Sequence, residues 1–150
     1  MNHEQFTQAV DEGNFPGETL VPLPESFRNT NGSIQNLLLK PCTSIAAITS
    51  RKGAIRANHY HRTDWHYAYV ASGKVLYFER DIGDKRIPVP RVFLPGDMFF
   101  TPPMREHAML FGEDSLIFTF AKNVRSHEEH EADLVRVEFI APVIASEFLT

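Results

Sequence analysis

The stretch GAIRANHYHRTDWHYAYVASG, residues 53–73, holds three of the chain's seven histidines in a run rich in Ala and aromatic residues. His59 and His61 lie two positions apart, so a β-strand directs both side chains to one face. Residues 62–65 can reverse the chain, so that the next strand brings His66 back beside this pair. The pattern therefore predicts three imidazoles inside one apolar interior.

Buried imidazoles need partners, because each unpaired buried polar group costs ~1 to 3 kcal/mol. A divalent transition metal meets that need, since imidazole nitrogen is a favoured ligand of such ions. His107 is a fourth candidate ligand, because it opens an apolar run shortly after two prolines. A lone buried histidine is more often a core residue, so it is the clustering that favours a metal site. We expect iron, with zinc, nickel, manganese or copper as alternatives.

Alternation also assigns the neighbours of these histidines to faces. It places Ile55 and Ala57 on the inner face of their strand and Arg56 on the outer face. In the next strand it places His66 on the inner face. The aromatic residues of that strand then lie outside, packed against the N-terminal arm or a second subunit: Trp65, Tyr67 and Tyr69.

The middle of the chain predicts an all-β fold. Short runs rich in Val, Ile, Phe, Tyr and Leu alternate there with Gly, Pro and Asp, which is typical of a sandwich or barrel. Turns are expected at 72–74, at 95–97 and, as a tight hairpin end, at 112–114. The expected strands are residues 34–40, 44–50, 54–61, 65–72, 74–81, 91–94, 97–102, 106–111 and 116–122.

One structural domain is expected from 150 residues. It divides into an N-terminal arm (1–33) with a short helix at 3–12, a barrel (34–121) and a C-terminal extension (122–150). The extension is expected to hold a short polar helix followed by a strand. Its HEEHE segment, with His127 and His130, is expected to be a charged, solvated surface.

The composition limits the expected binding partners and the expected cellular compartment. The net charge of -4 offers no basic face for nucleic acid, so a small-molecule substrate is the expected partner. Cys42 is the single cysteine, which excludes an intramolecular disulfide and suits a reducing compartment. The chain shows neither a secretory start nor an apolar run of the ~18 residues that a membrane span needs. We therefore expect a cytoplasmic protein that does not enter a membrane.

The histidine segments resemble the two sequence motifs of the cupins. Gly53, His59, His61, His66 and Gly73 fall at the spacing of the first motif. The second motif is matched at Gly96, Pro102 and His107. The resemblance implies an all-β double-stranded β-helix, or jelly-roll barrel, that holds a divalent metal through His59, His61, His66 and His107.

The match departs from the cupin pattern at three positions. Met104 and Phe111 replace a glycine and an asparagine, and His66 stands where cupins usually carry a glutamate ligand. Four neutral histidines would leave the ion its full charge and make it a stronger Lewis acid. Alternatively, His66 does not bind, and a site of three histidines keeps open positions.

The resemblance implies three alternative functions. A carboxylate-free site favours a histidine-ligated Fe(II) dioxygenase that acts on a small polar metabolite. The first alternative is a sugar or nucleotide-sugar isomerase or epimerase of polysaccharide metabolism. The second is a non-catalytic ligand-binding protein whose metal site is saturated, because catalysis needs an open position.

Two further residues are candidates for the chemistry. The hydroxyl of Tyr77 could serve as an acid or a base, and Arg105 lies beside the segment of His107. Asp64 could orient a histidine ligand, although an aspartate in a turn more often caps its own backbone. A homodimer is also expected, with the apolar C-terminal tail and the N-terminal arm as its contacts.

Overall fold

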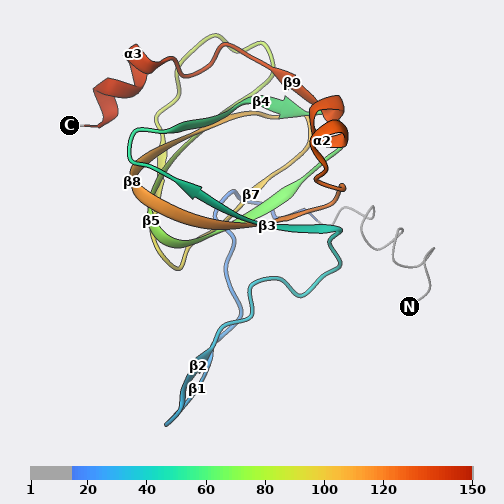
Figure 1. Cartoon of the computed structure of the whole chain (residues 1–150), viewed down its shortest axis with the longest axis vertical. Coiled ribbons are helices and arrows are strands. Elements are labelled where there is room, and N and C mark those ends of the chain that lie inside the picture. Colours follow the sequence, from blue (N-terminus) through green and yellow to red (C-terminus); the bar gives the residue numbers. More distant parts are fainter. Residues whose placement is uncertain (1–14, 150) are drawn as a thin grey trace.

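The computed structural model describes residues 15–149, so the helix expected at residues 3–12 lies outside the described part of the chain. An antiparallel seven-stranded sheet forms the body and curls into a barrel (Figure 1). Its strands are β3 (Ser44–Ser50), β4 (Ile55–His61), β5 (His66–Arg80), β6 (Arg91–Phe93), β7 (Met98–Thr101), β8 (Glu106–Ala121) and β9 (Leu134–Arg136). The predicted all-β fold is therefore confirmed.

β5 and β8 are the longest strands, and each was predicted as two. They pair antiparallel along their length, with register shifts between Val70 and Val75. Gly73 lies within these shifts at φ +94°, so the expected turn at 72–74 is a bend inside β5. The hairpin end expected at 112–114 is likewise wrong, because β8 runs through it. The bends let one pair of strands contribute to both sides of the barrel.

The interior is apolar at one end of the barrel. Ala68 and Val70 follow His66 on the inner face of β5, as alternation predicted, and both are buried. The cluster that fills this end consists of Ala68, Val70, Val75, Tyr77, Phe93, Phe99, Met109, Phe111 and Ile117. It closes one end of the barrel and leaves the other to the histidines.

The N-terminal arm covers an outer face of the sheet. Trp65 and Tyr67 pack there against Val21 and Leu23, which confirms that these aromatic residues meet the arm. Half-buried Cys42 belongs to the same cluster. The strand predicted at 34–40 is wrong beyond its first residue, because residues 35–43 form no strand.

The C-terminal extension covers another outer face. It holds α2 (His127–Asp133), then β9, α3 (Pro142–Ala145) and a 3₁₀ turn η1 (Ser146–Phe148). The helix followed by a strand was predicted. The apolar tail packs on its own barrel through Ile144 and Phe148. No helix in residues 15–149 combines the length and the apolar character needed to cross a bilayer.

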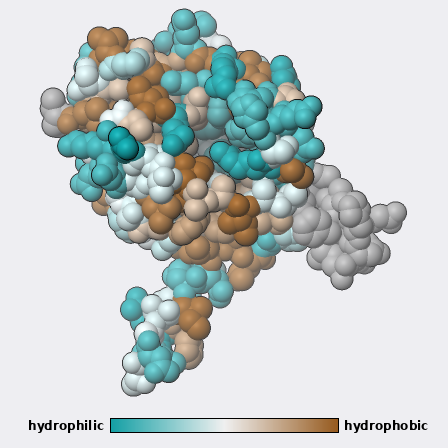
Figure 2. Space-filling view, viewed as in Figure 1, coloured by the Kyte–Doolittle hydropathy of each residue, from teal (hydrophilic) through white to brown (hydrophobic). Residues whose placement is uncertain are grey.

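A hairpin formed by β1 (Phe27–Asn29) and β2 (Gly32–Ile34) stands off from the barrel (Figures 1 and 2). Its cross-strand pair of Phe27 and Ile34 is exposed, at 60% and 63% of each residue's surface. An isolated hairpin is marginally stable in water. The homodimer predicted through the N-terminal arm and the C-terminal tail remains a prediction.

Candidate metal centre

A β-bulge in β4 sets the direction of its histidines. Ala57 and Asn58 have φ values of 69° and 54°, and the register against β8 shifts between Ala57 and His59. Asn58 faces outward, where its amide nitrogen donates to Ile140 O and its amide oxygen accepts from Ile140 N, both at 3.0 Å. The extra residue of a bulge reverses the alternation on either side of it.

The bulge corrects two predictions about the faces of β4. The side chain of Ile55 packs in the outer cluster with the C-terminal tail, although the residue also borders the histidine cavity. Arg56, predicted to face outward, lines the same cavity as the histidines. Strict alternation failed because it counted through the bulge at Asn58.

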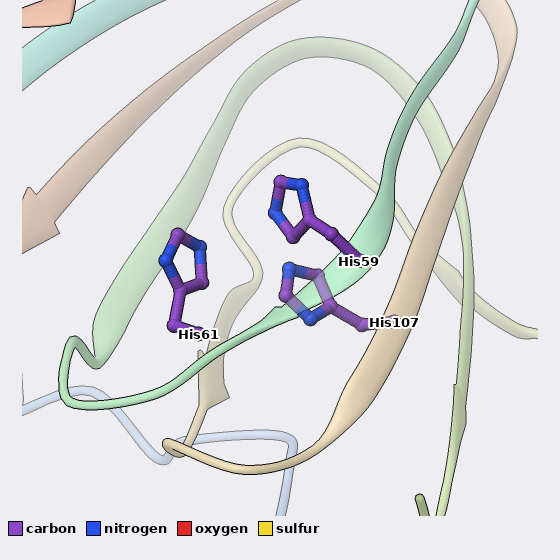
Figure 3. Close-up of side chains that lie close together, drawn as sticks. All are labelled: His59, His61 and His107. Carbon is purple, nitrogen blue, oxygen red and sulfur yellow. The ribbon is translucent and has the colours of Figure 1, made fainter. Parts of the chain in front are cut away.

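Three buried histidines converge at the open end of the barrel (Figure 3). His59 and His61 come from β4 and His107 comes from β8, and one ligand nitrogen of each lies within 4.8 Å of the others. The ring centroid of His59 lies 4.7 Å from that of His61 and 4.8 Å from that of His107. The cluster predicted from sequence thus forms for these three residues.

The hydrogen bonds of these rings suit a metal ligand set. Nδ1 of His107 lies 3.1 Å from Arg105 O, and because a carbonyl only accepts, that nitrogen carries the proton. Nε2 of His107 then presents a lone pair, and it has no partner among the described residues. Nδ1 of His59 is also buried without a hydrogen bond there, whereas Nδ1 of His61 lies 3.4 Å from an Asp133 carboxylate oxygen, which would hold a proton on Nδ1 and leave Nε2 to face an ion. A divalent ion would satisfy lone pairs that otherwise cost ~1 to 3 kcal/mol each.

Burial keeps the imidazoles neutral. Burial, with a smaller contribution from neighbouring histidines, lowers the pKa of His59 to about 2, that of His61 to about 4 and that of His107 to about 3. Burial also lowers the pKa of His66 well below its usual value. Neutral imidazole is the form that binds a metal, so the site is ready for an ion at neutral pH.

We expect the metal-free protein to lose stability as the pH falls from 7 towards 4. Unfolded histidines take up protons near pH 6.5, whereas the buried ones resist down to about 4 and below, so the unfolded state binds more protons in this window. Asp64 has the opposite effect on stability, because burial raises its pKa to about 6. We expect the four buried histidines to outweigh this single carboxyl group. Urea unfolding at several pH values measures the trend. A constant or rising midpoint below pH 6 would contradict it.

His66 lies beside the three histidines but outside their tight group. Its ring centroid is 5.8 Å from that of His61 and 5.6 Å from that of His107. It does not arrive through a β4–β5 hairpin as predicted, because both strands pair with β8 instead. Its role as a ligand remains a prediction.

The two proposed catalytic residues both lie near His107, because the ring centroid of Tyr77 is 6.3 Å from that of His107 and Arg105 O is 3.1 Å from His107 Nδ1. Tyr77 is fully buried, its hydroxyl is 2.8 Å from Thr101 Oγ1, and burial raises its pKa. Arg105 forms ion pairs with Glu79 and Asp81. Neither side chain lines the cavity that holds the histidines. Their catalytic roles remain predictions that this geometry does not favour.

Sequence reasoning missed two residues of α2. His130 is half-buried, with its ring centroid 5.4 Å from that of His61, so the HEEHE segment is not wholly a solvated surface. Asp133 places one carboxylate oxygen 3.4 Å from His61 Nδ1. Asp64 caps a distant backbone instead, accepting from Asn123 N at 2.9 Å. The sequence signal for these two residues was their spacing, because residues three positions apart, such as His130 and Asp133, lie on the same face of a helix.

The histidines lie in a cavity of about 540 Å³. Three exposed arginines also line it: Arg56, Arg125 and Arg136. Arg136 pairs with Glu131 at 2.8 Å. Arg56 donates to Ser50 Oγ and Thr49 O. Within residues 15–149, neither Arg56 nor Arg125 has a carboxylate within ion-pair distance. The cavity thus combines a candidate metal site with two arginines that form no ion pair, of which Arg125 still feels the charge of Asp64.

No protein-family model matches the sequence, and no curated protein matches it. Solved structures do match the fold. The sugar 3,4-ketoisomerase QdtA from Thermoanaerobacterium thermosaccharolyticum, in complex with TDP, is 13% identical, with a TM-score of 0.61 over 85% of this chain and 91% of that chain. The epimerase RmlC from Legionella pneumophila, in complex with dTDP-4-keto-L-rhamnose, is 15% identical, with a TM-score of 0.60 over 81% and 73%.

A third match is to part of a longer protein. The capsular polysaccharide assembling protein CapF from Staphylococcus aureus is 20% identical, with a TM-score of 0.56 over 78% of this chain and 34% of that chain. At these identities the likeness establishes the fold. The seven-stranded antiparallel barrel, with its histidines at one end, is the architecture that the two sequence motifs implied. This chain therefore has the cupin fold.

Proposed function

We propose that this protein is a metal-dependent isomerase or epimerase of a nucleotide-linked keto sugar. The observation that carries the proposal is that one cavity holds both the histidine cluster and two arginines, Arg56 and Arg125, that form no ion pair among the described residues. Structural neighbours with the same fold act on, or are bound to, TDP-linked compounds. The fold and the cavity together support this alternative better than the iron dioxygenase expected first.

The arginines suit a diphosphate. Guanidinium groups bind phosphate oxygens through paired hydrogen bonds, and these charge-assisted bonds are stronger than neutral ones. Arg56 is held in place by its bonds to Ser50 and Thr49, so it is oriented before a ligand binds. The cavity volume falls within the range of small-molecule sites. The substrate would thus be anchored by its diphosphate, with its sugar directed to the histidines.

The histidines suit the chemistry of a keto sugar. A divalent ion held by His59, His61 and His107 would supply a Lewis acid for the keto oxygen. Isomerisation and epimerisation each move a proton at a carbon next to the carbonyl, which requires a proton acceptor at the cavity wall. Neither reaction consumes an oxidant, and this distinguishes the proposal from a dioxygenase.

Deuterium exchange tests the proposed function. The metal-loaded protein is incubated with TDP-4-keto-6-deoxyglucose in D₂O, and the sugar is analysed by NMR spectroscopy. We expect solvent deuterium at carbons next to the keto group and no uptake of oxygen. An unchanged sugar under these conditions would contradict the proposal. Oxygen consumption with a small polar metabolite would support the dioxygenase instead.

We expect Arg56→Gln to weaken TDP binding by about 10- to 100-fold, because a hydrogen bond to a charged group contributes ~1.5 to 3 kcal/mol. Metal content should not change, since Arg56 is not a ligand. Isothermal titration calorimetry measures the affinity. Arg86→Gln is the matched control, because Arg86 is exposed and pairs with Asp84 outside this cavity. Equal affinities for the two variants would exclude Arg56 from the anion site.

A further inference from the structure

Helix α2 brings a fifth histidine to the cavity from outside the barrel. His130 lines the same cavity as the histidine cluster, and its ring centroid lies 5.4 Å from that of His61 and 6.2 Å from that of His59. Burial lowers the pKa of His130, so neutral imidazole is the favoured form. The side chain can therefore donate one hydrogen bond and accept another at the cavity wall.

The C-terminal end of α2 is fixed to the loop that joins β4 to β5. One carboxylate oxygen of Asp133 accepts from the backbone and hydroxyl of Thr63, and the other accepts from Asp64 N. The backbone of Arg62 donates to Asp133 O at 2.9 Å. Because His61 ends β4 just before this loop, the anchor also fixes His130 relative to His61.

The position of His130 differs from that of the three clustered histidines. His59, His61 and His107 belong to the barrel wall, and an ion held by three protein ligands keeps an open position. His130 is not part of the group whose ligand nitrogens lie within 4.8 Å of one another. It is close enough to this group to reach a small molecule bound at the ion.

We propose that His130 hydrogen-bonds to the molecule bound at the open position of the metal ion. This assigns a substrate-contacting role to α2, a segment outside the barrel. The inference rests on the metal site used in the proposed function, but it does not depend on which molecule is the substrate. His130 lines this cavity, whereas Tyr77 and Arg105 do not.

Azide binding to the cobalt-loaded protein tests the inference without a substrate. Azide occupies an open position of Co(II) and changes its visible spectrum, so its affinity can be titrated. We expect His130→Ala to bind azide about 10- to 100-fold more weakly, as the loss of a hydrogen bond to a charged group predicts, and to bind cobalt as wild type does. His130→Gln should recover much of the affinity, because its amide can still donate.

His127→Ala is the matched control, because His127 is exposed on the same helix and does not line the cavity. It should bind azide as wild type does. Unchanged azide affinity in His130→Ala would overturn the inference, and so would loss of cobalt, which would make His130 a ligand. A wild-type protein that takes up no cobalt would overturn it as well. If the His130 effect appears but no keto sugar reacts, the proposed function alone fails.

Discussion

His107→Gln is expected to lose tight metal binding and to keep the fold. Nε2 of His107 is the buried nitrogen that faces the other two histidines without a hydrogen bond among the described residues. Losing an outer-shell partner of a metal ligand costs 10- to 100-fold in affinity, so losing a ligand should cost more than about 100-fold. The Gln side chain is polar and of similar length, so it can still approach Arg105 O.

Titration with zinc, followed by calorimetry, measures the loss of affinity, and thermal unfolding of the metal-free variant checks the fold. His127→Gln is the control, because it removes a histidine that does not line the cavity. We expect the control to bind zinc as wild type does. Equal zinc affinity in wild type and His107→Gln would mean that any bound metal lies elsewhere.

Gly73→Ala is expected to destabilise the protein by about 3 kcal/mol or more, because two penalties combine. Gly73 has φ +94°, where a Cβ is disfavoured. A Cβ there would also lie 2.6 Å from Asp114 O and 2.6 Å from Ser115 Cα, which are backbone atoms of the paired strand. That strand cannot move away without disturbing the β5–β8 ladder, so the clash persists.

Gly83→Ala isolates the backbone penalty from the clash. Gly83 has a similar φ of +86°, but nothing lies within 4 Å of a Cβ built on it. We expect it to cost only about 1 to 2 kcal/mol, the penalty of the left-handed conformation alone. Urea unfolding compares the two variants. A cost for Gly73→Ala no greater than that for Gly83→Ala would show that β5 and β8 are not packed as described.

The sequence predicted the parts of the site that lie within one strand. The spacing of His59 and His61 placed both inside, because no irregularity separates them. It predicted the wrong face for Ile55 and Arg56, because the bulge at Asn58 depends on bonds to Ile140, which is 82 residues away. The alternation of inward and outward residues predicts a strand, but it cannot predict a bulge that a distant segment stabilises.

Long-range contacts also explain the other errors. The segment around Gly73 looked like a turn and that around Gly112 like a hairpin end, but β5 and β8 pair with each other through the bend and remain continuous. The charges of the HEEHE segment indicated a solvated helix, yet Asp133 anchors α2 to Thr63 and Asp64 and brings His130 to the cavity. These contacts are tertiary, so local sequence patterns could not reveal them.

The central claim is that His59, His61 and His107 bind one metal ion, and X-ray absorption spectroscopy of the zinc-loaded protein tests it most directly. We predict one equivalent of zinc with a first shell that contains three or more imidazole nitrogens at about 2.0 to 2.1 Å. The spectrum should also show scattering from the more distant atoms of the imidazole rings. A protein that takes up no metal, or an ion surrounded only by oxygen, would contradict the claim.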